Sequence, residues 1–355
     1  MKLIEPMIRI AKSMYRDLTN RIYLMQLKPN KTLFSTYWIV FLLIIVSSVI
    51  AFNVHAQDDY PNRTVKIIYP FGPVGGVPEQ VLRIFTNDLS ARFGQSFVIE
   101  HRPGASTNIA AAIAARARPD GYTLFMSNVA SNALNKWTYK KLDYDPESFA
   151  TISIMATTTF LIVVNPDSAI NNIQDLVTSA NKSTVSFKYG SLGNGGAAHL
   201  LTELFKTKTG IKELLHVPYK SGATTDLMAG RLDFIIDASV INQVKTGQLK
   251  ALAVTSPKRW PTLPDLPTTA EAGYPDVTML AFIGLSAPSG TPPVILEKLN
   301  QAIREIAANP DNVKRMLSIH AQPMITTRIQ AADFIRETSD KWRPVIKSLN
   351  LNFED

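Results

Sequence analysis

Apolar and polar residues follow one another in an order that predicts strand, turn and helix. Residues 65–69 form a short β-prone run that stops at Pro70, and a turn rich in glycine and proline follows. Between residues 81 and 93 large apolar side chains then recur at every fourth position, and the run stops at Gly94. This spacing predicts a helix with one apolar face, ended by the residue type favoured just past a helix; Pro78 fits its first turn.

The same alternation continues along the chain. Further strands are predicted at residues 97–99, 122–126, 161–164, 185–189, 214–217, 234–236 and 249–254. Further helices are predicted at 109–117, after Asn172, after Gly196 towards Gly210, from Pro292 to Asn309 and around Trp342. Such alternation is typical of an α/β fold with a largely parallel sheet covered on both faces. Pro344 is expected to kink or shorten the last helix.

The first 56 residues have the pattern of an export signal. Residues 37–52 are apolar and uncharged, Lys28 and Lys31 precede them, and small residues lead up to Ala56. We therefore expect residues 1–56 to be a signal peptide, cleaved after Ala56, which sends the chain to the periplasm. A membrane anchor is the alternative, because an apolar run of this length is near the lower limit for a span. Translation could begin at Met1 or at Met25.

Composition narrows the class of protein. The 355 residues are 46% hydrophobic and 19% charged, which suits two domains or one large one and excludes a disordered or fibrous chain. Zero cysteines exclude disulfides, thiolate nucleophiles and cysteine-ligated metals. Seven basic and two acidic residues precede residue 57, so +5 of the formal +8 charge lies in the signal and +3 remains. No concentrated basic stripe is left for nucleic acid.

Two turns share one chemical character. The turns 70–76 and 190–196 each join an apolar strand to a helix start and are rich in glycine. Glycine lets a ligand approach the backbone closely, and the free N–H groups at a helix start carry partial positive charge. Together these features predict a carboxylate or phosphate site, although neither turn matches a P-loop or GxGxxG. Ordinary tight turns between strand and helix are the alternative.

Catalytic and metal-binding patterns are weak. The five histidines form no HxxxH or HExxH motif, and no serine lies in GxSxG. Ser191, His199 and Asp237 could meet as a triad, but these residue types are too common for the combination to count. We therefore expect no catalytic residues, no metal and no cofactor.

Several motifs resemble those of the Bug-type (TctC-like) receptors of tripartite tricarboxylate transporters. They are PF at 70–71, GG at 75–76, EHRPGA at 100–105, ARPDGYTL at 117–124, YKKLDYD at 139–145, HVPYK at 216–220, LKALAV at 249–254, PDLPT at 264–268 and APSGTP at 287–292. They occur in the family's order and spacing from Tyr60 to Lys347.

The resemblance implies a type II periplasmic-binding-protein fold, with two α/β lobes hinged by two crossover strands near 158–164 and 280–285. Lobe one would comprise residues 58–159 plus 284–355, and lobe two residues 160–283. Such a receptor is a monomer that is not an enzyme: it binds a small carboxylate between the lobes and delivers it to a tripartite tricarboxylate-type membrane permease. A periplasmic sensor subunit is one alternative, and a hydrolase or isomerase using His199 with Ser191 is another.

The resemblance also implies the ligand-binding residues. They are Phe71, Gly72, Pro73, Gly75, Gly76 and Val77 in the first turn, Ser191, Gly193, Asn194 and Gly195 in the second, and Ser127, Asn128, Ser131, His199, Tyr219 and Asp237 elsewhere. The chain departs from the family pattern at Glu79, where an aspartate is common, at Ser106, where glycine is usual, and at Phe282, where tryptophan is typical. About two residues are also missing after Lys220. The identity of the acid does not follow from the sequence.

Overall fold

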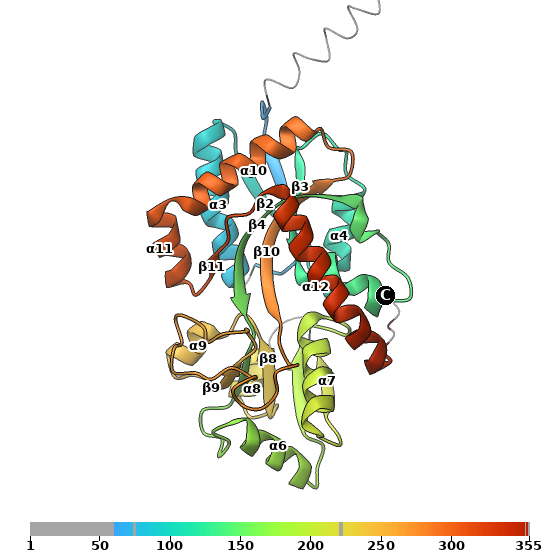
Figure 1. Cartoon of the computed structure of the whole chain (residues 1–355), viewed down its shortest axis with the longest axis vertical. Helices are drawn as coiled ribbons and strands as arrows, with labels where there is room; N and C mark the ends of the chain where they lie inside the picture. The colour runs from blue at the N-terminus through green and yellow to red at the C-terminus, as the bar shows by residue number, and fades with distance from the viewer. Residues whose placement is uncertain (1–59, 74–75, 220–222, 352, 354–355) are drawn as a thin grey trace, which may run out of the picture. The chain divides into compact units, whose positions relative to one another are not determined.

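The structure is a computed structural model that describes residues 60–73, 76–219, 223–351 and 353. The chain divides into two units, residues 1–60 and residues 61–355, and the fold below is that of the second unit (Figure 1). The predicted signal peptide, its cleavage site and the alternative start at Met25 lie outside the described residues. No helix within the described ranges is long and apolar enough to cross a membrane.

The first sheet has six strands in the order β11-β4-β10-β3-β1-β2. They are β1 (Val65–Tyr69), β2 (Phe97–His101), β3 (Thr123–Asn128), β4 (Phe149–Thr159), β10 (Leu280–Pro288) and β11 (Gln322–Pro323). β1 pairs in parallel with β2 and β3, whereas β10 is antiparallel to both β3 and β4. The first sheet is therefore mixed.

The second sheet has five strands in the order β7-β6-β8-β5-β9. They are β5 (Leu161–Val164), β6 (Lys188–Ser191), β7 (Leu215–Pro218), β8 (Phe234–Asp237) and β9 (Lys250–Val254). β6 pairs in parallel with β7 and β8, whereas β5 is antiparallel to β8 and β9. The prediction of a largely parallel sheet is wrong. The chain passes directly from β4 into β5 and returns into β10, so these strands run against those of the strand–helix units.

The chain crosses between the sheets at two places. Phe160 alone separates β4 from β5, inside the predicted crossover at 158–164. The return occurs just before β10, where the Met279 N–H donates to the Thr255 carbonyl at 3.0 Å. The predicted lobe boundaries stay predictions; the first falls at Phe160, and the second, between residues 283 and 284, falls inside β10.

Helices cover both sheets (Figure 1). Those in the segments of the first sheet are α3 (Val77–Phe93), α4 (Asn108–Ala115), α5 (Asn135–Thr138), α10 (Pro293–Ala308), α11 (Pro310–Ser318) and α12 (Arg328–Leu349). Those in the segments of the second are α6 (Ile173–Lys182), α7 (Ala197–Thr209), α8 (Ala223–Met228) and α9 (Ile241–Lys245). α3 and α7 each begin directly after a predicted glycine turn.

Local signals placed most of these elements correctly. α3 ends at Gly94 and α7 at Gly210, each glycine adopting the left-handed conformation, and the Asn172 side chain caps α6 by accepting from the Asp175 N–H. Other features differ. The strand predicted from residue 185 begins at Lys188, and α12 runs through Pro344 to Leu349. The strands β4 and β11 and the helices α5, α9 and α11 were not predicted.

One apolar core continues across both sheets. It joins Phe282 of the first sheet to Phe234 of the second and includes Leu200 of α7 and Trp342 and Ile346 of α12. The picture shows α12 reaching from the helices of the first sheet towards α7 (Figure 1). Because Trp342 and Ile346 are buried on either side of Pro344, their packing offsets the backbone hydrogen bond that proline cannot make, and the expected shortening of α12 does not occur.

Candidate ligand-binding site

The carboxyl ends of strands from the two sheets meet near the glycine turns. The first turn follows β1, and a Cβ atom built on Gly76 would lie 4.0 Å from the Cβ of Ser239, just after β8. The second turn follows β6, and its Asn194 carbonyl accepts a hydrogen bond at 2.8 Å from Ser106, which lies between β2 and α4. Each glycine turn therefore follows a strand of one sheet and contacts a residue from a segment of the other sheet. Crevices outside the carboxyl ends of strands are where open α/β sheets bind ligands.

The helices after both turns begin without a side-chain cap. The residues at the N-cap positions of α3 and α7 are Gly76 and Gly196, and neither helix start accepts a capping side chain. By contrast, the side chains of Asn172, Asn309 and Thr327 cap α6, α11 and α12. No side-chain cap therefore accepts from the first N–H groups of α7 or from the Val77 N–H at the start of α3, where Pro78 has no N–H, and a bound carboxylate could accept at these positions.

The first turn is only partly described. Phe71 is half-buried and packs its ring 5.5 Å from that of Tyr69, Gly72 is half-buried, and Pro73 is exposed. Gly75 lies outside the described residues. Val77 is 1% exposed, so its side chain belongs to the core and only its backbone is placed to face a ligand.

A buried acid, Glu79, lies in the first turn of α3. Arg83 donates to its Oε1 from two nitrogens, at 2.6 and 3.1 Å, and His101 Nε2 is 3.5 Å from the same oxygen. Burial, with the neighbouring Glu79 charge, raises the pKa of Tyr69, which therefore stays a neutral phenol. Since Arg83 neutralises Glu79, this carboxylate does not cancel the positive end of α3.

The residues at the end of β3 are buried and polar. Ser127 accepts from the Ser286 hydroxyl at 3.2 Å, and Ser131 donates to Asn132 Oδ1 at 2.8 Å. Asn128 Oδ1 accepts from the N–H groups of the following turn, at 3.0 and 3.2 Å. The Asn128 Nδ2 atom is buried and has no hydrogen-bond partner among the described residues. An unpaired buried amide costs about 1–3 kcal/mol, so this donor marks a place for a ligand or water oxygen.

The second turn rests on two histidines. Ser191 Oγ donates to the Gly193 carbonyl at 3.0 Å and lies 2.7 Å from His216 Nε2. Because the hydroxyl has a single proton, His216 Nε2 is the donor in the second contact and cannot serve as a base for Ser191. His199 Nδ1 instead accepts from the Gly195 N–H at 2.9 Å, and its ring stacks on His216 with centroids 3.9 Å apart.

Both imidazoles are neutral near pH 7. Burial lowers the pKa of His199 to about 4. Burial also lowers the pKa of His216 to about 4, with a further contribution from His199 and an opposing one from Glu203. Neutral rings suit the contacts observed, since a protonated His199 Nδ1 could not accept from Gly195. His216 was not among the predicted site residues.

The Ser191, His199 and Asp237 triad is not formed. Asp237 Oδ1 accepts from both the N–H and the hydroxyl of Ser239, each at 2.6 Å. Burial raises the pKa of Asp237, against the effect of these two hydrogen bonds. The Tyr219 hydroxyl donates to Asp226 at 2.6 Å, so its polar end is already engaged. The Tyr219 backbone N–H donates to the Ser191 carbonyl at 2.8 Å, but no hydrogen bond among the described residues joins Asp237 to His199 or Ser191.

Two residues that the sequence did not indicate hold the second turn from the side of the first sheet. Ser106 Oγ and Tyr139 Oη both donate to the Asn194 carbonyl, at 2.8 and 2.7 Å. In the sequence, Ser106 stands out only as a departure from the family pattern, and Tyr139 only as part of a motif. Their sequence separations from Asn194, 88 and 55 residues, leave no local signal for the contact.

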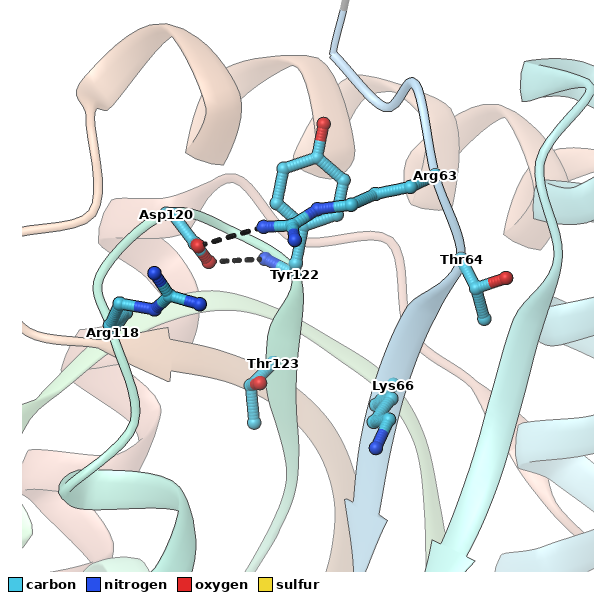
Figure 2. A pocket seen from close by; sticks show the side chains of 7 residues that line it. All are labelled: Arg63, Thr64, Lys66, Arg118, Asp120, Tyr122 and Thr123. Atoms are coloured by element: carbon cyan, nitrogen blue, oxygen red, sulfur yellow. Dashed lines mark hydrogen bonds and ion pairs between the residues drawn. The ribbon is translucent and has the colours of Figure 1, made fainter.

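Two cavities lined by described residues lie elsewhere. One of 300 Å³ is lined by Arg63, Thr64, Lys66, Arg118, Asp120, Tyr122 and Thr123 at the amino ends of β1 and β3. Figure 2 shows Arg63 bonded to Asp120 and lying over the Tyr122 ring. The second, of 410 Å³, is lined by Leu204, Lys208, Pro275, Asp276, Lys341 and Val345. Neither cavity includes a predicted site residue.

Comparison with known proteins identifies the family. The model of the family "Tripartite tricarboxylate transporter family receptor" (TctC) matches residues 81–351. BugT of Bordetella pertussis is 32% identical over 304 residues, which are 82% of this chain and 91% of BugT. The solved structure of R. palustris Rpa4515 with adipate is 32% identical, with a TM-score of 0.79 over 83% of this chain and 100% of that one.

MatC from Rhodopseudomonas palustris, solved with bound malate, is 26% identical, with a TM-score of 0.75 over 81% of this chain and 100% of that one. These matches confirm the resemblance seen in the motifs and the predicted α/β fold of the periplasmic-binding-protein type. The family is one of solute receptors rather than enzymes. The chain therefore belongs to the TctC family of tripartite tricarboxylate transporter receptors.

Proposed function

We propose that this chain is a periplasmic receptor that binds a small organic carboxylate between two lobes and delivers it to a tripartite tricarboxylate-type permease. The observation that carries the proposal is the pair of helix starts, at Gly76 of α3 and Gly196 of α7, that have no side-chain cap. Each of these glycines lies beside a residue from a segment of the other sheet. Relatives with adipate and with malate bound support a carboxylate ligand.

Main-chain N–H groups can hold a carboxylate without a cationic side chain. Each charge-assisted hydrogen bond contributes about 1.5–3 kcal/mol, and two helix starts supply several donors. The unpaired Asn128 Nδ2 at the end of β3 adds a further donor. Neutral donors also allow release, because no buried cation is left unpaired when the acid departs.

The roles of the predicted residues differ within this site. We assign the backbone of Gly76 and Val77, the Asn128 side chain and the start of α7 after Gly196 to the ligand. The Gly195 N–H is already bonded to His199, so Gly195 and His199 position the second turn rather than face the acid. Ser191 has the same positioning role through His216 and Gly193.

Lobe closure is the proposed mechanism. Lobe one, residues 58–159 plus 284–355, and lobe two, residues 160–283, would move about the two chain crossings at Phe160 and Met279. An acid that touches both helix starts stabilises only the closed form, which is the differential affinity that ligand-driven closure requires. Export by residues 1–56 would bring the receptor to the periplasm.

A thermal-shift panel tests the carboxylate assignment. Adipate, malate, citrate and glutamate are each compared with the matching neutral diamide or ester. At a hundredfold excess over Kd, a ligand adds about 2.7 kcal/mol to the free energy of unfolding, which raises Tm by several degrees in a chain of this size. We expect an acid to raise Tm, its neutral analogue to leave Tm unchanged, and the bound acid to be recovered intact. Stabilisation by the neutral analogues alone would contradict the proposal.

A further inference from the structure

The peptide unit between Asn194 and Gly195 is held on both sides. Its carbonyl accepts from Ser106 Oγ and Tyr139 Oη, at 2.8 and 2.7 Å, and both donors belong to segments of the first sheet. Its N–H donates to His199 Nδ1 in α7 at 2.9 Å. One peptide group thus joins the segments of the first sheet to the start of α7.

Ser106 is presented from a strained turn. Ala105, Ser106 and Thr107 have φ values of 44°, 46° and 78°, a left-handed run that side chains with a Cβ rarely adopt. Asn135 Nδ2 supports this turn by donating to the Ser106 carbonyl at 3.1 Å and to Asn108 Oδ1 at 2.6 Å. Glycine would adopt this conformation without strain. We infer that the hydrogen bond of the Ser106 hydroxyl offsets the strain of having a serine there.

Tyr139 is fixed by the end of the chain. The Lys140 N–H donates to the Phe353 carbonyl and the Phe353 N–H donates to the Thr138 carbonyl, both at 3.0 Å, which pairs Phe353 with Tyr139. The Phe353 ring in turn lies 5.3 Å from the His199 ring. The Tyr139 hydroxyl therefore reaches Asn194 from a segment whose backbone is hydrogen-bonded to Phe353.

We propose that Ser106 and Tyr139 are positioning residues for the ligand site, forming with the Asn194 carbonyl a latch between the two lobes. The inference rests on the proposed function. When the lobes close, the two hydroxyls fix the Asn194–Gly195 peptide and so orient the N–H groups that begin α7. When the lobes open, the carbonyl loses both donors and the turn loses that orientation. Closure and affinity are thus coupled through one backbone group.

Distance measurements on the ligand-free protein test the latch. The chain has no cysteine, so Ile113→Cys on α4 and Leu215→Cys on β7, both exposed, accept spin labels on the two sides. Double electron–electron resonance is recorded for the labelled parent, for Ser106→Ala, for Tyr139→Phe and for both changes together. Tyr122→Phe is the matched control, because the Tyr122 hydroxyl donates to Asn62 and Tyr122 lines the cavity of Figure 2, which includes no predicted site residue.

We expect a short-distance population in the labelled parent that Ser106→Ala and Tyr139→Phe each reduce and that Tyr122→Phe leaves unchanged. Affinity for adipate should fall roughly threefold to tenfold in each latch variant, mainly through faster dissociation. Urea denaturation of the ligand-free variants should match the parent closely. Unchanged distance distributions in both latch variants overturn the proposal. Failure of the carboxylate assignment would look different, with no acid raising Tm while the latch variants still alter the distances.

Discussion

Replacing Gly195 by alanine should weaken ligand binding while lowering the free energy of unfolding no more than a control substitution does. A Cβ atom at this position would lie 2.7 Å from Thr138 Cγ2, 3.0 Å from Phe353 Cδ2 and 3.3 Å from Tyr139 Cε2. All three neighbours belong to segments of the first sheet, whereas Gly195 begins the chain into α7. The added methyl group therefore acts as a wedge between the two sides when they are together.

The size of the effect has two parts. Gly195 has a φ of 70°, so alanine there costs about 1–2 kcal/mol whatever its surroundings. Overpacking by one methyl group costs about 1–3 kcal/mol more, but only in the closed arrangement, because opening relieves the contact. That second part corresponds to a loss of affinity of roughly fivefold to 150-fold.

Gly247→Ala is the matched control, since Gly247 has a φ of 73° and no atom within 4 Å of the added methyl group. Calorimetric titration with the acid that gives the largest thermal shift measures affinity, and urea denaturation measures the free energy of unfolding. Both variants should lose similar unfolding free energy, while only Gly195→Ala should bind weakly. Equal affinities in the two variants would refute the wedge.

Three further outcomes are expected. Gly76→Ala should leave the free energy of unfolding nearly unchanged, because its φ is −65° and the nearest atom would be 3.7 Å away; weaker binding in calorimetry would then report the ligand's approach to the first turn, and normal binding would exclude it. Asn128→Asp should weaken carboxylate binding at least about tenfold, since it replaces a buried donor by a charge of the ligand's sign; Asn128→Ser serves as the uncharged comparison. Finally, the free energy of unfolding should fall as pH drops from 7 to 5, by on the order of 2 kcal/mol for each of two histidines, because the unfolded chain protonates His199 and His216 while the folded chain keeps their pKa values near 4. A His199→Gln/His216→Gln variant with the same pH profile would contradict that attribution.

The elements that the sequence predicts well are those whose signals are local. Gly94 and Gly210 end helices because the left-handed conformation suits glycine, and Asn172 starts one through its own side chain. By contrast, β4 is a threonine-rich strand of which nearly every residue is buried, so it shows no alternation to detect. The direction of β4 and β10 depends on how the chain passes between the two sheets. A short stretch of sequence does not indicate this path.

The residues of the candidate site divide in the same way, into those with a local sequence signal and those without one. The two glycine turns could be found because strand, turn and helix are adjacent in the sequence. The groups that hold the second turn come from elsewhere: His216 lies 25 residues from Ser191, and Ser106 lies 88 residues from Asn194. Their types alone carry no signal, since a serine or a histidine has many ordinary uses in a chain of this length.

The second turn shows how a site made of backbone can be both rigid and neutral. Its internal polar groups bond to fixed partners: the Gly193 carbonyl to Ser191, the Asn194 carbonyl to the two hydroxyls, and the Gly195 N–H to His199. The last bond requires an unprotonated Nδ1, and burial beneath the turn, by lowering the pKa of His199 to about 4, keeps it so. A charged imidazole would bind an acid more strongly, but its protonated Nδ1 could not accept from the Gly195 N–H, and it would leave a buried cation when the acid departs. The polar groups inside the turn are thus bonded within the protein, and in the proposed site the first N–H groups of α7 are the part of this segment that binds the ligand.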